Sequence, residues 1–84
     1  MAADFELPFA PDTYIGFISG FVLEAGRFRS KIEFCIGDKR VDAKSVLGLL
    51  NAGSPLCTRF SLRIEGDDER QAMERLSVFI GKFR

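Results

Sequence analysis

The chain has 84 residues, 46% of them hydrophobic, and its twelve basic and twelve acidic residues cancel. This size and composition predict one folded domain over residues 1–84 and argue against a disordered chain. Because positive charge is not clustered and no apolar stretch is long enough to cross a bilayer, we expect binding neither to nucleic acid nor to a membrane.

The first third of the chain predicts a strand followed by a helix. Residues 3–9 alternate between apolar and acidic side chains, and Pro8 is typical of a strand at a sheet edge. We expect a loop over residues 10–13 and then a helix over residues 15–25, which ends near Gly26. The predicted inward face of this helix consists of Ile15, Ile18, Phe21, Val22 and Ala25.

The middle of the chain predicts a hairpin. Residues 31–36 alternate, with Ile32, Phe34 and Ile36 on one face. Gly37-Asp38 is typical of a tight hairpin turn, and residues 40–43 then form a short returning strand.

A short helix, a strand and a longer helix complete the chain. Ser45 is a favourable N-cap for a helix over residues 46–50, and Gly53 is a favourable terminator. Residues 58–65 alternate again, and residues 66–69 begin a last helix with an acidic first turn. The apolar stripe of this helix consists of Ala72, Leu76, Phe79, Ile80 and Phe83.

The predicted order is therefore β-α-β-β-α-β-α. Every predicted strand has one apolar and one polar face, which indicates an antiparallel sheet with all helices on one side. The fold class is α+β, an open-faced sandwich of four strands and three helices. We expect the core to contain Phe21, Ile32, Phe34, Phe60, Leu62, Leu76 and Ile80.

The sequence contains no histidine. This excludes histidine-dependent nucleophile pairs, a histidine general base and histidine-ligated zinc. Cys35 and Cys57 are widely spaced and form no CxxC motif, so we expect no metal site, and we expect no cofactor because no glycine-rich nucleotide loop is present. The composition predicts a protein that is not an enzyme and that keeps its thiols reduced in the cytoplasm.

Three segments resemble a known family. VDAKSVLGLLNAG, residues 41–53, resembles the regulatory-serine region of HPr, the small phosphocarrier of the bacterial sugar phosphotransferase system. FVLEAGRFRSKI and IEGDDERQAMERL resemble the end of its first helix with its second strand, and its last strand with its last helix. The resemblance implies the HPr-like fold, a four-stranded antiparallel sheet covered by three helices, in a divergent, Crh-like member of the family.

The resemblance fails at the family's phosphorylation loop. Counted back from Phe21-Val22, the family's GLHxRPA falls on residues 12–18 of this chain, which read DTYIGFI. The family's active-site histidine thus falls on Tyr14, its arginine on Gly16 and its proline on Phe17. The comparison implies that the chain is not a histidine phosphocarrier. We expect Tyr14 and Phe17, with Ile15 and Ile18, to form an apolar surface or the edge of the core, and we assign Tyr14 and Phe17 to partner binding.

Two interpretations of the Ser45 region remain open. The resemblance implies that Ser45 is phosphorylated by an enzyme like HPr kinase, whereas the residue by itself implies only an N-cap. Val46, Leu47 and Leu50 match an apolar patch through which the family contacts partner proteins. The alternative is that Leu49 and one or two of its neighbours simply belong to the core.

Three functional hypotheses follow. The first is a regulatory or adaptor protein related to the phosphotransferase system, with HPr kinase and a transcriptional regulator or a phosphotransferase-system protein as partners. The second is an HPr-fold interaction module unconnected with sugar transport. The third is a phosphocarrier that uses a residue other than histidine.

Overall fold

A computed structural model of the chain describes residues 1–6, 11–52 and 59–83, with the backbone alone at 11–13 and 52. The element order is the predicted β-α-β-β-α-β-α. The elements are β1 (Ala2–Glu6), α1 (Pro11–Ala25), β2 (Lys31–Ile36), β3 (Lys39–Asp42), α2 (Val46–Ala52), β4 (Arg59–Glu65) and α3 (Glu69–Gly81).

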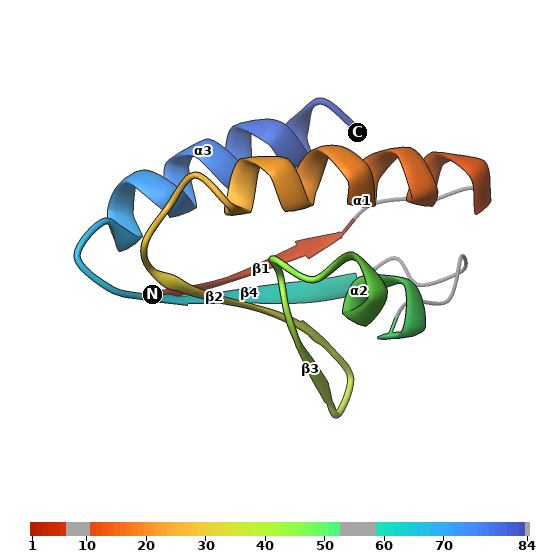
Figure 1. Ribbon diagram of the computed structural model, residues 1–84, viewed down its shortest axis with the longest axis horizontal. Coiled ribbons are helices and arrows are strands. Elements are labelled where there is room, and N and C mark those ends of the chain that lie inside the picture. The colour runs from red at the N-terminus through yellow and green to blue at the C-terminus, as the bar shows by residue number, and fades with distance from the viewer. Residues whose placement is uncertain (7–10, 53–58, 84) are drawn as a thin grey trace.

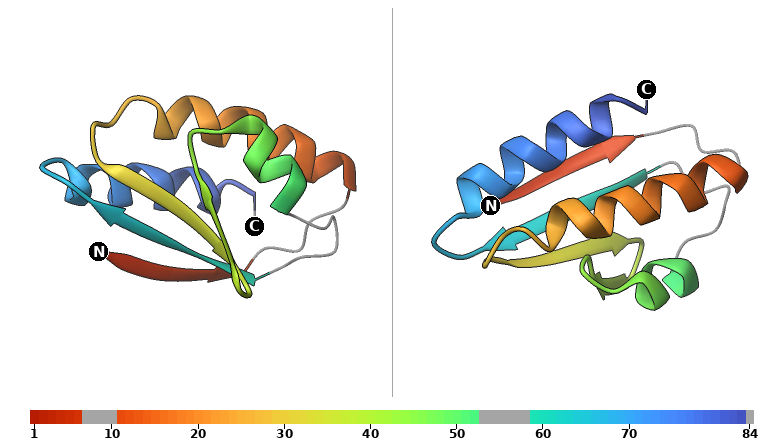
Figure 2. Two further views of the ribbon diagram at one scale, coloured as in Figure 1. Left: turned by 60° about the horizontal axis from the view of Figure 1, so that its bottom comes forward. Right: turned by 45° about the horizontal axis from the view of Figure 1, so that its top comes forward.

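The four strands form one antiparallel sheet in the order β1-β4-β2-β3. Helices α1 and α3 run side by side over one face, and α2 lies beside β3 and the first half of α1 (Figures 1 and 2). The register places Phe60 opposite Phe5 and Leu62 opposite Phe34, so the apolar residues of neighbouring strands share the helix-covered face. Within the described ranges, no helix is long and apolar enough to span a membrane.

Stacked aromatic rings form the centre of the core. The rings of Phe34 and Phe60 stack with their centroids 4.5 Å apart, and Phe21 meets Phe34 edge-on at 5.7 Å. Phe17 stacks on Phe21 at 5.2 Å and so continues the cluster along α1. All seven predicted core residues are at most 4% exposed: Phe21, Ile32, Phe34, Phe60, Leu62, Leu76 and Ile80.

Helix α1 differs from the prediction in its start and in its phase. It begins at Pro11, inside the predicted loop over residues 10–13. Proline suits the first helical position because it has no N–H group, and the first N–H groups of a helix lack partners within it. Ile15, predicted to face inward, is 60% exposed, and Val22 is only half-buried. Among the α1 side chains that the structure describes, at residues 14–25, the buried ones are Tyr14, Phe17, Ile18, Phe21 and Ala25.

Gly20 allows α1 and α3 to approach each other closely. A Cβ atom at this position would lie 2.7 Å from the tip of the Phe79 ring. Glycine inside a helix lowers the stability of that helix by about 1 kcal/mol relative to alanine. Packing against Phe79 and the other residues of α3 offsets that cost, since tertiary contacts stabilise helices more than propensity does.

The remaining boundaries differ from the predictions by a few residues at most. Gly37 has a φ of 56°, as the first central residue of a two-residue hairpin loop requires. Strand β3 ends one residue before the predicted Ala43, and α2 extends to the last described residue of its segment. The predicted strand positions 7–9 and 58, the terminator Gly53 and Cys57 lie outside the described residues.

Asp68 joins the start of α3 to the start of β2. It occupies the N-cap position of α3, yet its side chain makes no capping hydrogen bond to that helix. Its carboxylate instead accepts hydrogen bonds from the backbone N–H groups of Arg29 and Ser30, at 2.8 and 2.9 Å, and from the Ser30 hydroxyl. Gly66 makes room for this contact, because a Cβ atom there would lie 2.7 Å from the Ser30 Cα atom.

The core predicts the effect of removing one ring. Phe34→Ala is expected to lower the free energy of unfolding by about 3–5 kcal/mol, because Phe34 is 1% exposed and stacks on Phe60. Urea denaturation followed by circular dichroism measures this. Val78→Ala is the control, since Val78 is 62% exposed and its truncation should change stability by no more than about 0.5 kcal/mol. Equal midpoints for native chain and Phe34→Ala would contradict the packing.

The Asp68 contact predicts acid sensitivity. The Ser30 hydroxyl, followed by the Arg29 N–H group, holds the pKa of the Asp68 carboxyl below its ordinary value. Because the folded pKa is the lower one, this contact stabilises the fold above the ordinary carboxyl pKa of about 3.9. The stabilisation is lost as the pH falls through the folded value.

Asp68→Asn should therefore show a weaker loss of stability than the native chain between about pH 4 and pH 2. The measurement is the urea midpoint at each pH. Asp67→Asn, a change at the exposed neighbouring residue, should keep the native slope. If the urea midpoint of Asp68→Asn changes with pH as steeply as that of the native chain, the Asp68 contact is not the source of the acid sensitivity.

Candidate functional site

Ser45 caps the first turn of α2. Its Oγ atom accepts a hydrogen bond from the Gly48 N–H group at 3.1 Å, and its carbonyl accepts one from the Leu49 N–H group at 3.1 Å. This confirms the predicted N-cap. Gly48 leaves room beside the hydroxyl, since a Cβ atom there would lie 3.2 Å from the Ser45 Oγ atom.

The turn before α2 is fixed by its own hydrogen bonds. The Asp42 carboxylate accepts from the Lys44 N–H group at 2.9 Å, and the Asp42 carbonyl accepts from the Ser45 N–H group at 3.0 Å. The Lys44 ammonium donates to the Phe28 carbonyl at 2.8 Å. The backbone that carries Ser45 is thus tied to the end of β3 and to the turn after α1, and Ser45 itself is half-buried.

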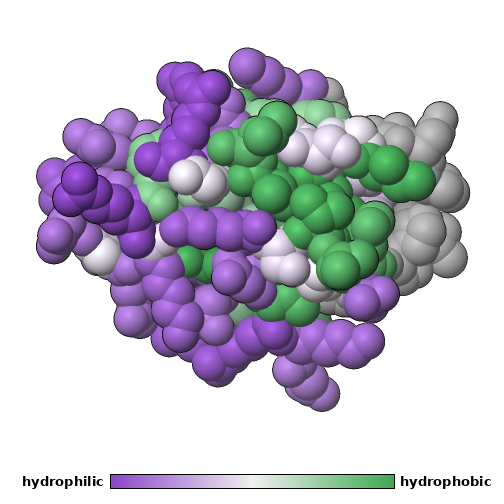
Figure 3. Space-filling view, in the orientation of Figure 1, coloured by the Kyte–Doolittle hydropathy of each residue, from purple (hydrophilic) through white to green (hydrophobic). Residues whose placement is uncertain are grey.

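Three apolar side chains of α2 face solvent. Val46 is 45% exposed, Leu47 73% and Leu50 43%, whereas Leu49 is fully buried in the core. We call Val46, Leu47 and Leu50 the α2 patch. Figure 3 shows hydrophobic side chains gathered over α2 and the adjoining part of α1, while hydrophilic side chains cover much of the rest of this face. The alternative that Leu49 and one or two neighbours belong to the core is correct for Leu49 and wrong for its neighbours in the α2 patch.

Tyr14 and Phe17 do not form a surface for a partner, and that prediction is wrong. Tyr14 is 4% exposed, and its hydroxyl donates a hydrogen bond to the Leu49 carbonyl at 3.0 Å. Phe17 is fully buried, with its ring against Phe21 and Phe83. Both side chains point inward because the buried face of α1 is centred differently from the predicted one. The exposed apolar residue of this turn is Ile15, which the sequence pattern had assigned to the core.

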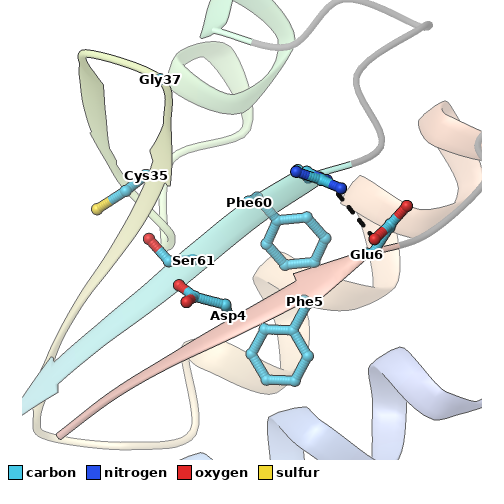
Figure 4. A pocket seen from close by; sticks show the side chains of 8 residues that line it. Asp4, Phe5, Glu6, Cys35, Gly37, Phe60 and Ser61 are labelled. Atoms are coloured by element: carbon cyan, nitrogen blue, oxygen red, sulfur yellow. Dashed lines mark ion pairs between the residues drawn. The ribbon is translucent and has the colours of Figure 1, made fainter.

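The open face of the sheet carries a shallow concavity with no evident chemistry. Cys35, Ser61 and Asp4 lie side by side there on β2, β4 and β1 (Figure 4). Arg59 and Glu6 form an ion pair of 3.6 Å at one end, with both side chains largely exposed. Among the described residues, no three histidine, cysteine or acidic side chains are grouped as metal ligands would be.

Comparison with known proteins points to one family. The family described as the PTS HPr component phosphorylation site matches residues 17–82. The HPr-like protein Crh of Halalkalibacterium halodurans is 44% identical over 62 residues, which are 74% of each chain. The HPr-like protein Crh of Bacillus subtilis is 37% identical over 60 residues, 71% of each chain.

A solved structure agrees with these relatives. HPr-C-His from Thermoanaerobacter tengcongensis superposes with a TM-score of 0.84 at 27% identity, over 98% of this chain and 92% of that one. The family match begins at residue 17, so it does not extend to Tyr14 or Gly16.

The cap predicts how Ser45 variants behave. Ser45→Ala is expected to lower the free energy of unfolding by about 1 kcal/mol, because the Gly48 N–H group loses its acceptor. Ser45→Asp keeps an acceptor and adds a charge that the helix dipole favours, so it should remain within about 0.5 kcal/mol of the native chain. Urea denaturation tests both variants, and an alanine variant as stable as the native chain would argue against the cap.

Proposed function

The chain belongs to the HPr family, and from this premise we propose that it is a regulatory or adaptor protein related to the phosphotransferase system, not a histidine phosphocarrier. Members of this family are not enzymes. The observation that carries the proposal is the difference in exposure between Tyr14 and the neighbouring α2 patch. Buried Tyr14 stands where the resemblance puts the phosphorylated histidine, while the α2 patch beside it stays exposed.

Ser45 is the switch in this proposal. Phosphorylation adds roughly two negative charges, and a phosphate at the start of a helix is favoured by the helix dipole. The sequence of α2, VLGLLNA, contains no charged residue. A phosphate on Ser45 would therefore place a strong negative charge beside Val46 and Leu47, on a helix that carries none of its own, which is a large change for any partner that contacts the α2 patch.

The apolar character of the α2 patch indicates what kind of partner it would bind. The α2 patch lacks charges of its own, and exposed contiguous apolar side chains mark protein interaction sites. We propose HPr kinase as the modifying enzyme. The regulated partner is a transcriptional regulator or a protein of the phosphotransferase system, in the bacterial cytoplasm.

A second candidate is an interaction module with no connection to sugar transport. It is favoured by the family match, which begins only at residue 17 and so leaves out Tyr14 and Gly16, the positions on which the resemblance puts the family's histidine and arginine. In that case Ser45 keeps its N-cap and is not a kinase substrate.

The deciding experiment is phosphorylation by HPr kinase from a Gram-positive bacterium. With ATP, we expect one phosphoryl group per chain, mapped to Ser45 by mass spectrometry, and none in Ser45→Ala. Ser19→Ala, which removes an exposed hydroxyl bonded only within α1, should be phosphorylated like the native chain. No incorporation into the folded native chain would favour the unconnected module.

Two further arms complete this experiment. Leu47→Glu should raise the KM for phosphorylation, whereas Leu23→Glu should not, because both leucines are 73% exposed and only Leu47 belongs to the α2 patch. Incubation with enzyme I and phosphoenolpyruvate should leave the mass unchanged, as the chain has no histidine. A stoichiometric gain of one phosphoryl group in that arm would support the third hypothesis, a non-histidine phosphocarrier.

A further inference from the structure

We propose that Tyr14 is a positioning residue that holds α2 in place and so sets the orientation of the α2 patch. The docking part of this inference rests on the proposed function. The part that concerns α2 itself rests on the contacts of Tyr14 alone.

The contact joins two helices that are distant in the chain. The Tyr14 hydroxyl, on α1, donates to the Leu49 carbonyl on α2, 35 residues later, in a buried hydrogen bond of 3.0 Å. Leu49 lies within the last four residues of α2, where helix carbonyl groups accept hydrogen bonds from outside the helix. Tyr14 therefore contacts the middle of α2, whereas Ser45 caps its start.

Helix α2 depends on such external contacts. It has seven residues, and an isolated helix of this length is not stable in water. Three contacts of different kinds hold it: the Ser45 cap at its start, the buried Leu49 side chain in its middle and the Tyr14 hydroxyl on the Leu49 carbonyl. The hydrophobic contact of Leu49 is non-directional, whereas the two hydrogen bonds fix direction.

The orientation of α2 decides which leucines face solvent. Leu49 and Leu50 are neighbours, yet one is fully buried and the other is 43% exposed. Because adjacent helical residues point about 100° apart, a modest rotation of α2 would redistribute exposure among the residues of the α2 patch. A fixed donor on α1 opposes that rotation, and a preformed surface binds its partner with less ordering cost than a mobile one.

Tyr14→Phe separates this hydrogen bond from the packing of the ring. The phenyl ring fills the same volume, while the Leu49 carbonyl loses its donor from α1. Loss of one buried hydrogen bond of this kind should increase the equilibrium constant for local opening of α2 about fivefold to tenfold. Hydrogen exchange of the backbone amides, measured by mass spectrometry or NMR, should show that acceleration at Leu49 and Leu50 and no change in β4 or α3.

A control variant and a kinase assay complete this experiment. Ser19→Ala removes a hydroxyl from the same helix without touching α2, and it should leave exchange in α2 unchanged. With HPr kinase and ATP, Tyr14→Phe should raise the KM for Ser45 phosphorylation several-fold at unchanged kcat, because the chemistry at Ser45 is untouched and only docking is weakened.

The outcomes separate the two proposals. Unchanged exchange in α2, or acceleration spread evenly over the sheet and all helices, would overturn the role of Tyr14 in holding α2. Faster exchange in α2 with an unchanged KM would overturn its role in docking. If the native chain is not phosphorylated at all, the proposed function fails, and the exchange arm still decides whether Tyr14 holds α2.

Discussion

The stacking of Phe34 on Phe60 is the contact on which the other elements depend. It joins the two central strands, β2 and β4, on the face that the helices cover. Phe21 meets Phe34 edge-on, and Phe17 extends the cluster along α1. Aromatic pairs prefer such stacked and edge-on geometries, and they contribute beyond the area they bury. The rotation of α1 about its axis is therefore set by Phe17 and Phe21, and with it the position of every other α1 side chain.

This constraint explains why Tyr14 is buried. Phe17 and Phe21 lie three and seven residues after Tyr14, which places all three on one face of a helix. Once the aromatic cluster has fixed that face, Tyr14 must point toward the core, and its hydroxyl needs a partner because a buried polar group without one is costly. The Leu49 carbonyl supplies that partner. The same rotation turns Ile15 and Gly16 outward.

Much of the fold was predictable, and the main error has a physical cause. Strands with strict alternation, such as residues 31–36, have only one phase that buries their apolar side chains, and Ser45 caps its helix through a local contact three residues away. Helix α1 has apolar residues at both Tyr14 and Ile15 and at both Phe21 and Val22, so two helical phases fit the pattern equally well. The choice between them depends on packing against Phe34 and Phe79, which no local pattern contains. The hydrogen bonds between Asp68 and Ser30 could not be predicted from a local pattern either, because they join residues 38 positions apart.

Exposure of the α2 patch has a cost that argues for a binding role. Leu47 keeps 73% of its surface in water. The core of this small domain does not cover all the apolar side chains of α2, and α2 has no charged side chains that could cover the rest. Burying such surface against a partner recovers roughly 25 cal/mol per Å² of apolar area. A phosphocarrier needs an accessible acceptor as well as a docking surface, and buried Tyr14 offers only a structural hydroxyl. In the proposed function the α2 patch serves to bind a partner, which is the property an adaptor requires, and a charge on Ser45 would be well placed to regulate that binding.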